Sequence, residues 1–221
     1  INRNTPDLFR RQIGYLLQAG HRFVTMDDVA AYYREGAVLP KNTVCLTFDD
    51  GYHDNLTEVL PILEEFGIPA VIYFATGFVK QRITDKGLPV CTKDQLQFLA
   101  GHPLITIGAH TDNHPRLSRL SAGEAWNEIS NGKALLEEWI GKPVLHFAYP
   151  KGDYSIQTIE LVKKAGFSTA VTVVPKFVGA DRDVLQIGRV PVDQGMPDWL
   201  FQNCCREGMT VYSKWREGLF R

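Results

Sequence analysis

Short apolar runs that alternate with helix signals are the feature that most constrains the fold of this chain. The runs are rich in branched and aromatic side chains, and each is about as long as a buried strand, which typically has about 4–8 residues. They are found at residues 44–48, 70–75, 105–109, 144–149 and 169–174.

Helix signals occupy the segments between and before these runs. Ser121 and Glu124 have the spacing of a capping box, and Gly141 ends the amphipathic stretch that follows them. Five more helices are predicted: one capped by Thr5 or Asp7, others over residues 57–66, 92–99 and 155–166, and one that contains Cys204 and Cys205.

A chain in which strands and helices alternate favours a parallel sheet covered by helices, built either as an open sheet or as a barrel. The sequence contains no internal repeat and no break in composition, so we predict a single domain over residues 1–221. In either architecture, the side chains that follow the strands gather at one edge, where function is usually located.

The overall charge argues against two classes of partner. With 24 Lys and Arg against 25 Asp and Glu, the net charge is −1, which gives no electrostatic attraction to nucleic acid or to an anionic membrane. The longest apolar run, residues 70–79, is too short to span a bilayer.

The four cysteines include no C-x-x-C pair, which disfavours a zinc ribbon. Cys204 and Cys205 are neighbours on a predicted helix. We expect a monomer.

Acidic and histidine side chains follow two of the predicted strands. Asp49 and Asp50 come directly after residues 44–48, and His110 follows residues 105–109, with His114 four residues later. On a helical turn, residues four apart have Cβ atoms roughly 5–6 Å apart, so two such imidazoles can share a metal. A carboxylate would complete a three-ligand set that leaves positions for water and substrate, which suits zinc, cobalt, nickel or iron.

Each half of this pattern also has a simpler interpretation. His110 and His114 would be two surface histidines around a turn that Pro115 ends. Asp-Asp-Gly is a common turn sequence, in which the aspartates cap the next helix. When both halves lie at one edge of a sheet, the metal site is favoured, with one aspartate on the metal and the other acting as a general base.

Three motifs resemble the ordered motifs of the polysaccharide deacetylase family, the NodB-homology carbohydrate esterases. They are Thr47-Phe48-Asp49-Asp50-Gly51, His110-Thr-Asp-Asn-His114 and Phe147-Ala-Tyr-Pro-Lys-Gly152, within a resemblance that extends from about Phe9 to Val192. The resemblance implies a distorted, incomplete (β/α) barrel and metal-dependent removal of acetyl groups from sugars. It also implies that Asp49 is the general base and that Asp50, His110 and His114 hold one divalent ion, Zn, Co or Ni.

The third motif implies contacts with the substrate and contains one departure. Many family members carry Arg-x-Pro-Tyr where this chain has Ala148, Tyr149, Pro150 and Lys151. We expect Tyr149, Pro150 and Lys151 to bind the substrate, with the backbone N–H of Lys151 stabilising the oxyanion. The absent arginine usually orients the catalytic aspartate. Arg189 is the candidate replacement, and the alternative is a surface arginine on an edge strand.

The Tyr-Pro-x-Gly form resembles a branch that includes poly-N-acetylglucosamine deacetylases. The resemblance therefore implies a hydrolase of linear amide C–N bonds that acts on an N-acetylated polysaccharide of a bacterial surface or biofilm, in an extracellular or cell-surface location. Two alternatives are an O-acetyl polysaccharide esterase and a non-catalytic carbohydrate-binding relative. The intact aspartates and histidines of the first two motifs argue against the second alternative.

The proton donor for the leaving amine is not evident in the motifs. The family usually supplies it as a histidine near the carboxyl end, whereas the last histidine here is His146. Because the chain starts with Ile1 rather than Met, we expect that an upstream segment was removed. In related branches of the family the equivalent histidine sits in a strand before the first helix, so the resemblance implies that this upstream segment held an N-terminal strand carrying the acid. The competing candidates are His53, or the metal and water alone.

Overall fold

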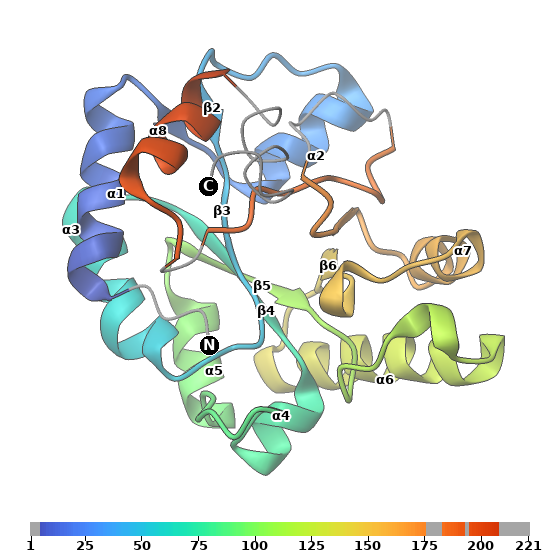
Figure 1. Ribbon diagram of the computed structural model, residues 1–221. Coiled ribbons are helices and arrows are strands. Elements are labelled where there is room, and N and C mark those ends of the chain that lie inside the picture. The colour runs from blue at the N-terminus through green and yellow to red at the C-terminus, as the bar shows by residue number, and fades with distance from the viewer. Residues whose placement is uncertain (1–4, 176–182, 193–194, 208–221) are drawn as a thin grey trace.

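The computed structural model describes residues 5–175, 183–192 and 195–207. Its centre is a sheet of five parallel strands in the order β3-β4-β5-β6-β7. The sheet curls into a half-barrel (Figure 1). The strands are β3 (Leu46–Phe48), β4 (Ala70–Phe74), β5 (Ile105–Ala109), β6 (His146–Ala148) and β7 (Thr169–Val171).

Short pairings extend the curl at both edges of the sheet. The strand β1 (Arg22–Phe23) pairs in parallel with β2 (Thr43–Val44), and only Cys45 separates β2 from β3. At the other edge, Ile187 forms a parallel bridge with Val171 of β7. The predicted distorted, incomplete (β/α) barrel is therefore confirmed.

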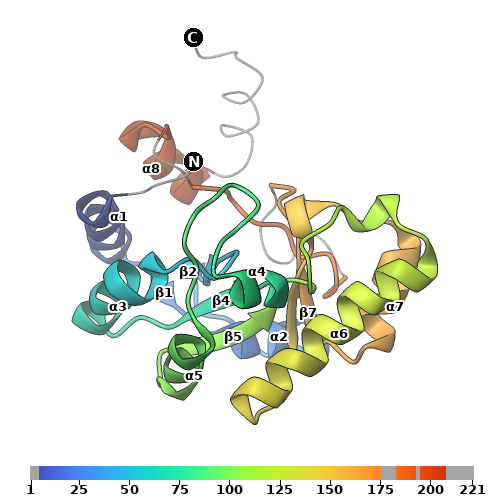
Figure 2. The same cartoon turned by 90° about the horizontal axis from the view of Figure 1, so that it is seen from below.

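Most of the helices cover the outer face of the half-barrel (Figures 1 and 2), whereas α2 packs against its inner face. The α-helices are α1 (Pro6–Gln18), α2 (Met26–Glu35), α3 (Leu60–Phe66), α4 (Thr76–Gln81), α5 (Lys93–Gly101), α6 (Ala122–Ile140), α7 (Ile156–Lys164) and α8 (Asp198–Glu207). A π-helical turn, η1 (Asn55–Val59), and two 3₁₀ turns, η2 (Leu117–Arg119) and η3 (Pro150–Gly152), complete the structure. Within the described residues, no helix is both long and apolar enough to cross a membrane.

Both faces of the central strands are buried, as the continuous apolar runs predict. In β4, Ile72 and Phe74 belong to the large core formed with α1, α3, α5 and α6. Val71 and Tyr73 point to the opposite face and join a second core, in which Val29 of α2 fills the inside of the half-barrel. Because the strands are held on both sides, the residues at their carboxyl ends are carried on a rigid base.

Most of the predicted elements are confirmed, and the departures have local causes. The hydroxyl of Thr5 accepts the N–H of Leu8 at 3.2 Å and caps α1, and Ser121 forms the predicted capping box at the start of α6. The run 44–48 is interrupted at Cys45. The helix predicted over 57–66 begins as the π-helical turn η1, because Pro61 in the next turn has no N–H to donate to a preceding carbonyl.

Two helices were not predicted from the sequence. The helix α2 starts with a capping box formed by Thr25 and Asp28, a signal that the sequence does contain. The helix α4 follows β4 after a single residue, Ala75, and has no side-chain cap, so only the structure reveals it.

Helix α6 approaches the loop after β5 at very short range. A Cβ atom at Gly132 would lie 2.7 Å from the carbonyl oxygen of Thr111 and 2.9 Å from the backbone nitrogen of Asp112. The N–H of Asp112 donates to the Glu128 carbonyl at 3.0 Å, and the Glu128 carboxylate accepts the backbone N–H of Asn113 at 2.7 Å. The absence of a side chain at position 132 lets α6 hold this loop.

We expect Gly132→Ala to lower the free energy of unfolding by about 1–3 kcal/mol, because the added methyl group would push α6 away from the loop. Gly123→Ala in the same helix is the matched control, since a Cβ there meets nothing within 4 Å. The control should be neutral or stabilising by up to about 1 kcal/mol, because alanine is the better helix former. Urea denaturation measures both, and equal effects would contradict the close-approach argument.

Candidate active site

A left-handed turn at the end of β3 aims the two adjacent aspartates. Asp50 has φ +69° and Gly51 has φ +67°, a conformation that is costly for a residue with a side chain. A Cβ atom at Gly51 would collide with the ring of Phe74, so this position admits only glycine. The turn directs Asp50 toward the loop after β5.

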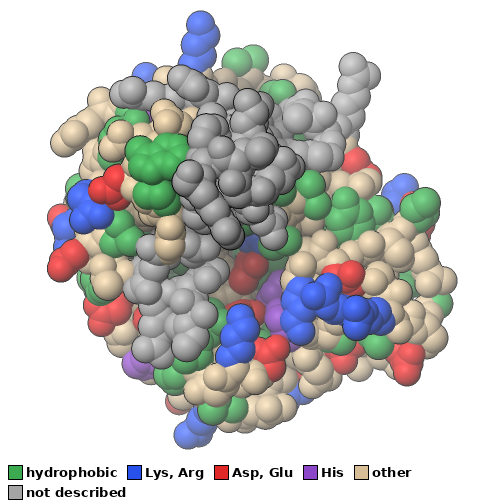
Figure 3. All heavy atoms as spheres, in the orientation of Figure 1, with side chains coloured by type: hydrophobic (Ala, Val, Ile, Leu, Met, Phe, Trp, Pro, Cys, Tyr) green, Lys and Arg blue, Asp and Glu red, His purple; other side chains and the backbone are tan. Residues whose placement is uncertain are grey.

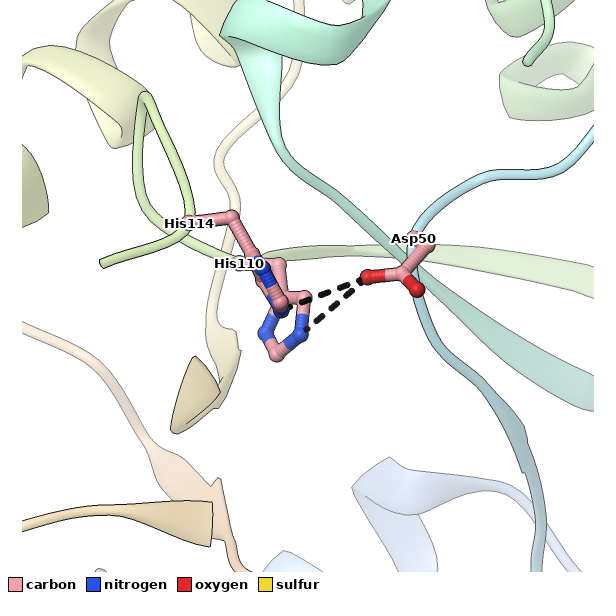
Figure 4. Close-up of side chains that lie close together, drawn as sticks. All are labelled: Asp50, His110 and His114. Carbon is pink, nitrogen blue, oxygen red and sulfur yellow. Dashed lines mark ion pairs between the residues drawn. The ribbon is translucent and has the colours of Figure 1, made fainter. Parts of the chain in front are cut away.

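Asp50, His110 and His114 form a group whose ligand atoms lie close enough to share one ion (Figure 4). The Asp50 Oδ1 atom is 3.6 Å from Nε2 of His110 and 3.4 Å from Nε2 of His114. This oxygen is buried and has no hydrogen-bond partner among the residues that the structure describes, whereas Oδ2 of the same carboxylate accepts the hydroxyl of Tyr52 at 2.7 Å. A buried carboxylate oxygen without a partner, facing two imidazole nitrogens, fits a divalent metal ion.

Different contacts favour metal binding at the two histidines: a hydrogen bond orients the ring of His110, and burial keeps the ring of His114 neutral. The Nδ1 atom of His110 lies 2.7 Å from the carbonyl oxygen of Ala148, which turns Nε2 toward Asp50. Burial, together with the neighbouring His110, lowers the pKa of His114 to about 4. His114 is therefore neutral at neutral pH, which is the form that binds metals.

The loop that carries both histidines is not helical, which corrects the geometry assumed from their spacing. Thr111 and His114 have φ +67° and +59°, and the chain bends at Asp112 and Asn113 between them. The two rings still meet, with centroids 4.8 Å apart. The interpretation of two surface histidines is wrong, since His110 is 1% exposed and His114 is 9% exposed.

Asp49 is held by a bidentate ion pair with Arg189. The two terminal nitrogens of Arg189 donate to the two carboxylate oxygens, both at 2.7 Å. Arg189 also donates to the hydroxyl of Thr47 and to the carbonyl of Thr172, both at 3.0 Å, which fixes the plane of its guanidinium group. The interpretation of Arg189 as a surface residue is wrong, because its side chain is only 14% exposed.

The charge of Arg189 controls the protonation of Asp49. Burial alone would raise the pKa of this carboxyl group, but the charge and hydrogen bonds of Arg189 outweigh it and hold the pKa at about 2. Asp49 is therefore ionised at neutral pH.

In the third motif, the structure places the side chain of Tyr149 differently from the prediction. Tyr149 is completely buried, and its hydroxyl donates to the carbonyl of Leu185 at 3.0 Å, so its side chain packs in the core rather than facing a substrate. Pro150 is buried as well, whereas Lys151 is exposed. Lys151 has φ +59°, and its Nζ lies 3.7 Å from Oδ2 of Asp85.

His53, the candidate proton donor within the chain, lies beside α5. Its Nε2 atom is 3.2 Å from Nε2 of Gln95, and its backbone N–H donates to the carbonyl of Pro89. Two further residues of the site were not predicted from the sequence. Tyr52 contacts Asp50, and its position two residues after Asp50 was a signal. Asp85 lies near His114.

Figure 3 shows a hollow on one face of the molecule, with Asp, Glu and His side chains at its bottom and Lys and Arg side chains at its side. The fold and these residues define a class: a curled parallel α/β sheet with a possible metal centre next to an ionised aspartate.

A comparison with protein families assigns this class to a family. The polysaccharide deacetylase family model matches residues 36–170, which is more than half of the chain. This chain belongs to the polysaccharide deacetylase family, whose members are hydrolases.

Individual relatives agree with this assignment. The chain is 27% identical over 188 residues to YxkH of Bacillus subtilis (strain 168), which is named as a polysaccharide deacetylase, covering 85% of this chain and 65% of that protein. It is 24% identical over 190 residues to the poly-beta-1,6-N-acetyl-D-glucosamine N-deacetylase of Staphylococcus aureus (strain MSSA476), covering 82% and 65%. The chain thus spans about 65% of the length of these curated relatives.

A solved structure has the same fold. The structure of IcaB from Ammonifex degensii superposes with a TM-score of 0.78 at 27% identity, covering 91% of this chain and 88% of that one. This similarity extends over the sheet and the surrounding helices, well beyond the three motifs.

We expect alanine at Asp50, His110 or His114 to lower the divalent metal content of the purified protein well below about one ion per chain, because each change removes one of only three protein ligands. Elemental analysis after dialysis measures the content. His21→Ala is the matched control and should keep the metal, since His21 and its contact, the carbonyl of Asn42, directly precede the parallel strands β1 and β2 and so lie at the opposite end of the strands from these motifs. Full metal content in His114→Ala would remove that residue from the ligand set.

We expect Arg189→Lys to slow acetyl removal on the order of 10²-fold, because lysine cannot make the two parallel hydrogen bonds that fix the Asp49 carboxylate. Metal content should stay unchanged. Arg119→Lys at an exposed position is the control and should have no effect. Unchanged turnover in Arg189→Lys would show that the orientation of Asp49 does not depend on the guanidinium group.

Proposed function

We propose that this chain is a metal-dependent hydrolase that removes N-acetyl groups from an N-acetylated polysaccharide. One observation carries the proposal: the buried Oδ1 of Asp50 has no hydrogen-bond partner and faces Nε2 of His110 and of His114. Beside it, Arg189 keeps Asp49 ionised and outside this group of three ligands. The site therefore has one carboxylate for metal binding and another for proton transfer.

Asp50, His110 and His114 are proposed to hold one divalent ion, Zn, Co or Ni. When bound, the ion would polarise the acetyl carbonyl and lower the pKa of water in the site. The three ligands give it one negative charge, from Asp50, because burial keeps His114 neutral at neutral pH.

Asp49 is proposed to be the general base. A carboxylate with a pKa of about 2 is a weak base, so it acts only on water whose own pKa has been lowered. Arg189 uses one lone pair on each oxygen of Asp49, which leaves the remaining lone pairs free to accept a proton. The same pairing keeps the carboxylate oriented throughout the reaction.

The Lys151 backbone N–H is proposed to stabilise the charge that develops on the carbonyl oxygen. The left-handed conformation of Lys151 supports this assignment, because it turns the backbone at the carboxyl end of β6. A direct substrate contact by the exposed Lys151 side chain is also proposed, whereas the buried Tyr149 is assigned to holding the loop in place.

The leaving amine needs a proton donor, and the positions of the six histidines narrow the choice within the chain. His110 and His114 belong to the metal group. His146 is buried and contacts Asp27 and Thr169. Of the remaining three, His21 and His102 contact a carbonyl oxygen and Glu64, respectively. His53, next to the Asp-Asp-Gly turn, is the best candidate among them.

The substrate class is proposed from the relatives. A Staphylococcus aureus relative is named as a poly-beta-1,6-N-acetyl-D-glucosamine N-deacetylase, which supports a poly-N-acetylglucosamine of a bacterial surface or biofilm and an extracellular or cell-surface location. An O-acetyl polysaccharide esterase is the second candidate, because ester cleavage would use the same residues. The two differ in product, since one releases a free amine and the other a free hydroxyl.

The decisive experiment measures free amines released from poly-N-acetylglucosamine, chitin and peptidoglycan oligomers, with Zn, Co or Ni added. We expect amine release that depends on the added metal. Asp49→Asn should keep its metal but lose roughly 10²–10⁴-fold in turnover, because an amide cannot accept the proton. Acetate released without a new amine from O-acetylated xylan would favour the esterase, and loss of metal in Asp49→Asn would reverse the roles of the two aspartates.

A further inference from the structure

A tight turn between α4 and α5 presents a carboxylate beside the metal group. The N–H of Thr84 donates to the carbonyl of Leu88 at 2.9 Å, and the Thr84 hydroxyl accepts the N–H groups of Lys86 and Leu88 at 3.3 and 3.2 Å. Thr84 is only 5% exposed, and Gly87 supplies the left-handed residue of the turn, with φ +74°. The position of Asp85 within this turn is therefore fixed by the backbone.

The base of the turn is joined to the segment that carries the aspartates. Ile83 and Pro89 form one antiparallel bridge, and Val90 forms another with Tyr52, whose hydroxyl donates to Asp50. The turn is thus part of the wall of the site.

Asp85 lies between two of the three motifs. Its Oδ2 atom is 3.8 Å from Nδ1 of His114 and 3.7 Å from Nζ of Lys151. The Asp85 side chain is 43% exposed, whereas the His114 side chain is 9% exposed. One carboxylate oxygen at the mouth of the site therefore faces both a buried imidazole and a surface ammonium group.

His114 needs such a carboxylate. Its Nδ1 atom is buried and has no hydrogen-bond partner, whereas the matching atom of His110 lies 2.7 Å from the Ala148 carbonyl. A metal-binding imidazole almost always donates its second N–H to a carboxylate, a carbonyl or water, which fixes both its tautomer and its orientation. One of the two histidines is thus fully oriented, and the other lacks only its acceptor.

We propose that Asp85 is a positioning residue for the metal centre, which accepts the Nδ1–H of His114 and thereby holds Nε2 of His114 toward Asp50. The separation of 3.8 Å exceeds hydrogen-bond range by less than about 1 Å, a distance that the side-chain torsions of a half-exposed aspartate can close. Lys151 pairs with the same oxygen and keeps the carboxylate at the mouth of the site. The inference rests on the metal centre proposed above.

The test measures the Zn²⁺ affinity of the 221-residue chain by competition with a chromogenic chelator. Asp85→Ala is expected to weaken Zn²⁺ binding by about 10–100-fold, the usual effect of losing such a partner. Asp85→Asn should lose less, because its amide oxygen still accepts a hydrogen bond but carries no charge. Asp94→Asn, an exposed aspartate in the first turn of α5, is the matched control and should bind as the wild type does.

Two further measurements separate positioning from general structural support. The melting temperature of the metal-free protein should be unchanged in Asp85→Asn, whereas the increase on adding Zn²⁺ should be smaller than in the wild type. In the Zn²⁺-loaded wild type, the His114 Nδ1–H proton should give a slowly exchanging NMR signal, and Asp85→Ala should lose it.

Three outcomes would overturn the inference. Zn²⁺ affinity within about threefold of the wild type in Asp85→Ala would show that His114 does not depend on Asp85. An equal loss of melting temperature in the metal-free and metal-loaded variants would assign Asp85 to the fold. Failure of the wild type itself to bind Zn²⁺, Co²⁺ or Ni²⁺ would overturn the proposed metal centre and this inference with it. The first two outcomes, in a wild type that does bind metal, would overturn the role of Asp85 alone.

Discussion

The site depends on one turn that separates two neighbouring negative charges. If Asp49 and Asp50 shared one environment, their repulsion would keep one of them protonated. The left-handed conformation of Asp50 and Gly51 sends one carboxylate to Arg189 and the other to the histidines. Phe74 packs where a side chain at position 51 would lie, so the turn is fixed by the core beneath it.

Much of the site could be predicted because it is encoded locally. Each motif stands directly after an apolar run, and parallel strands bring their carboxyl ends together. The local sequence also contained a signal for the face of the sheet toward which the Tyr149 side chain points, although the prediction did not use it. Phe147 and Tyr149 alternate with Ala148, and the structure places the two aromatic rings in the outer core and Ala148 inside the half-barrel. The backbone carbonyl of Ala148, at the end of this strand, accepts from Nδ1 of His110.

The remaining features depend on contacts that local patterns do not contain. Arg189 is 140 residues from Asp49, and its surroundings in the sequence fit a surface strand equally well. The non-helical loop between His110 and His114 packs closely against α6 at Gly132, a contact that a four-residue spacing cannot reveal. In both cases tertiary packing decides between conformations that the local sequence leaves open.

The balance of charge explains why such contacts are needed together. Asp49, Asp50 and Asp85 contribute three negative charges, and Arg189 and Lys151 contribute two positive charges, so the group has a net charge of −1. A divalent cation would change this to +1, and the total stays at +1 when Asp49 takes a proton from water, because the proton gained there balances the negative charge that develops on the substrate oxygen. The bound ion would then interact more strongly with the reacting state, which carries that negative charge, than with the neutral acetyl group, which is the condition for accelerating the reaction instead of only binding the polymer.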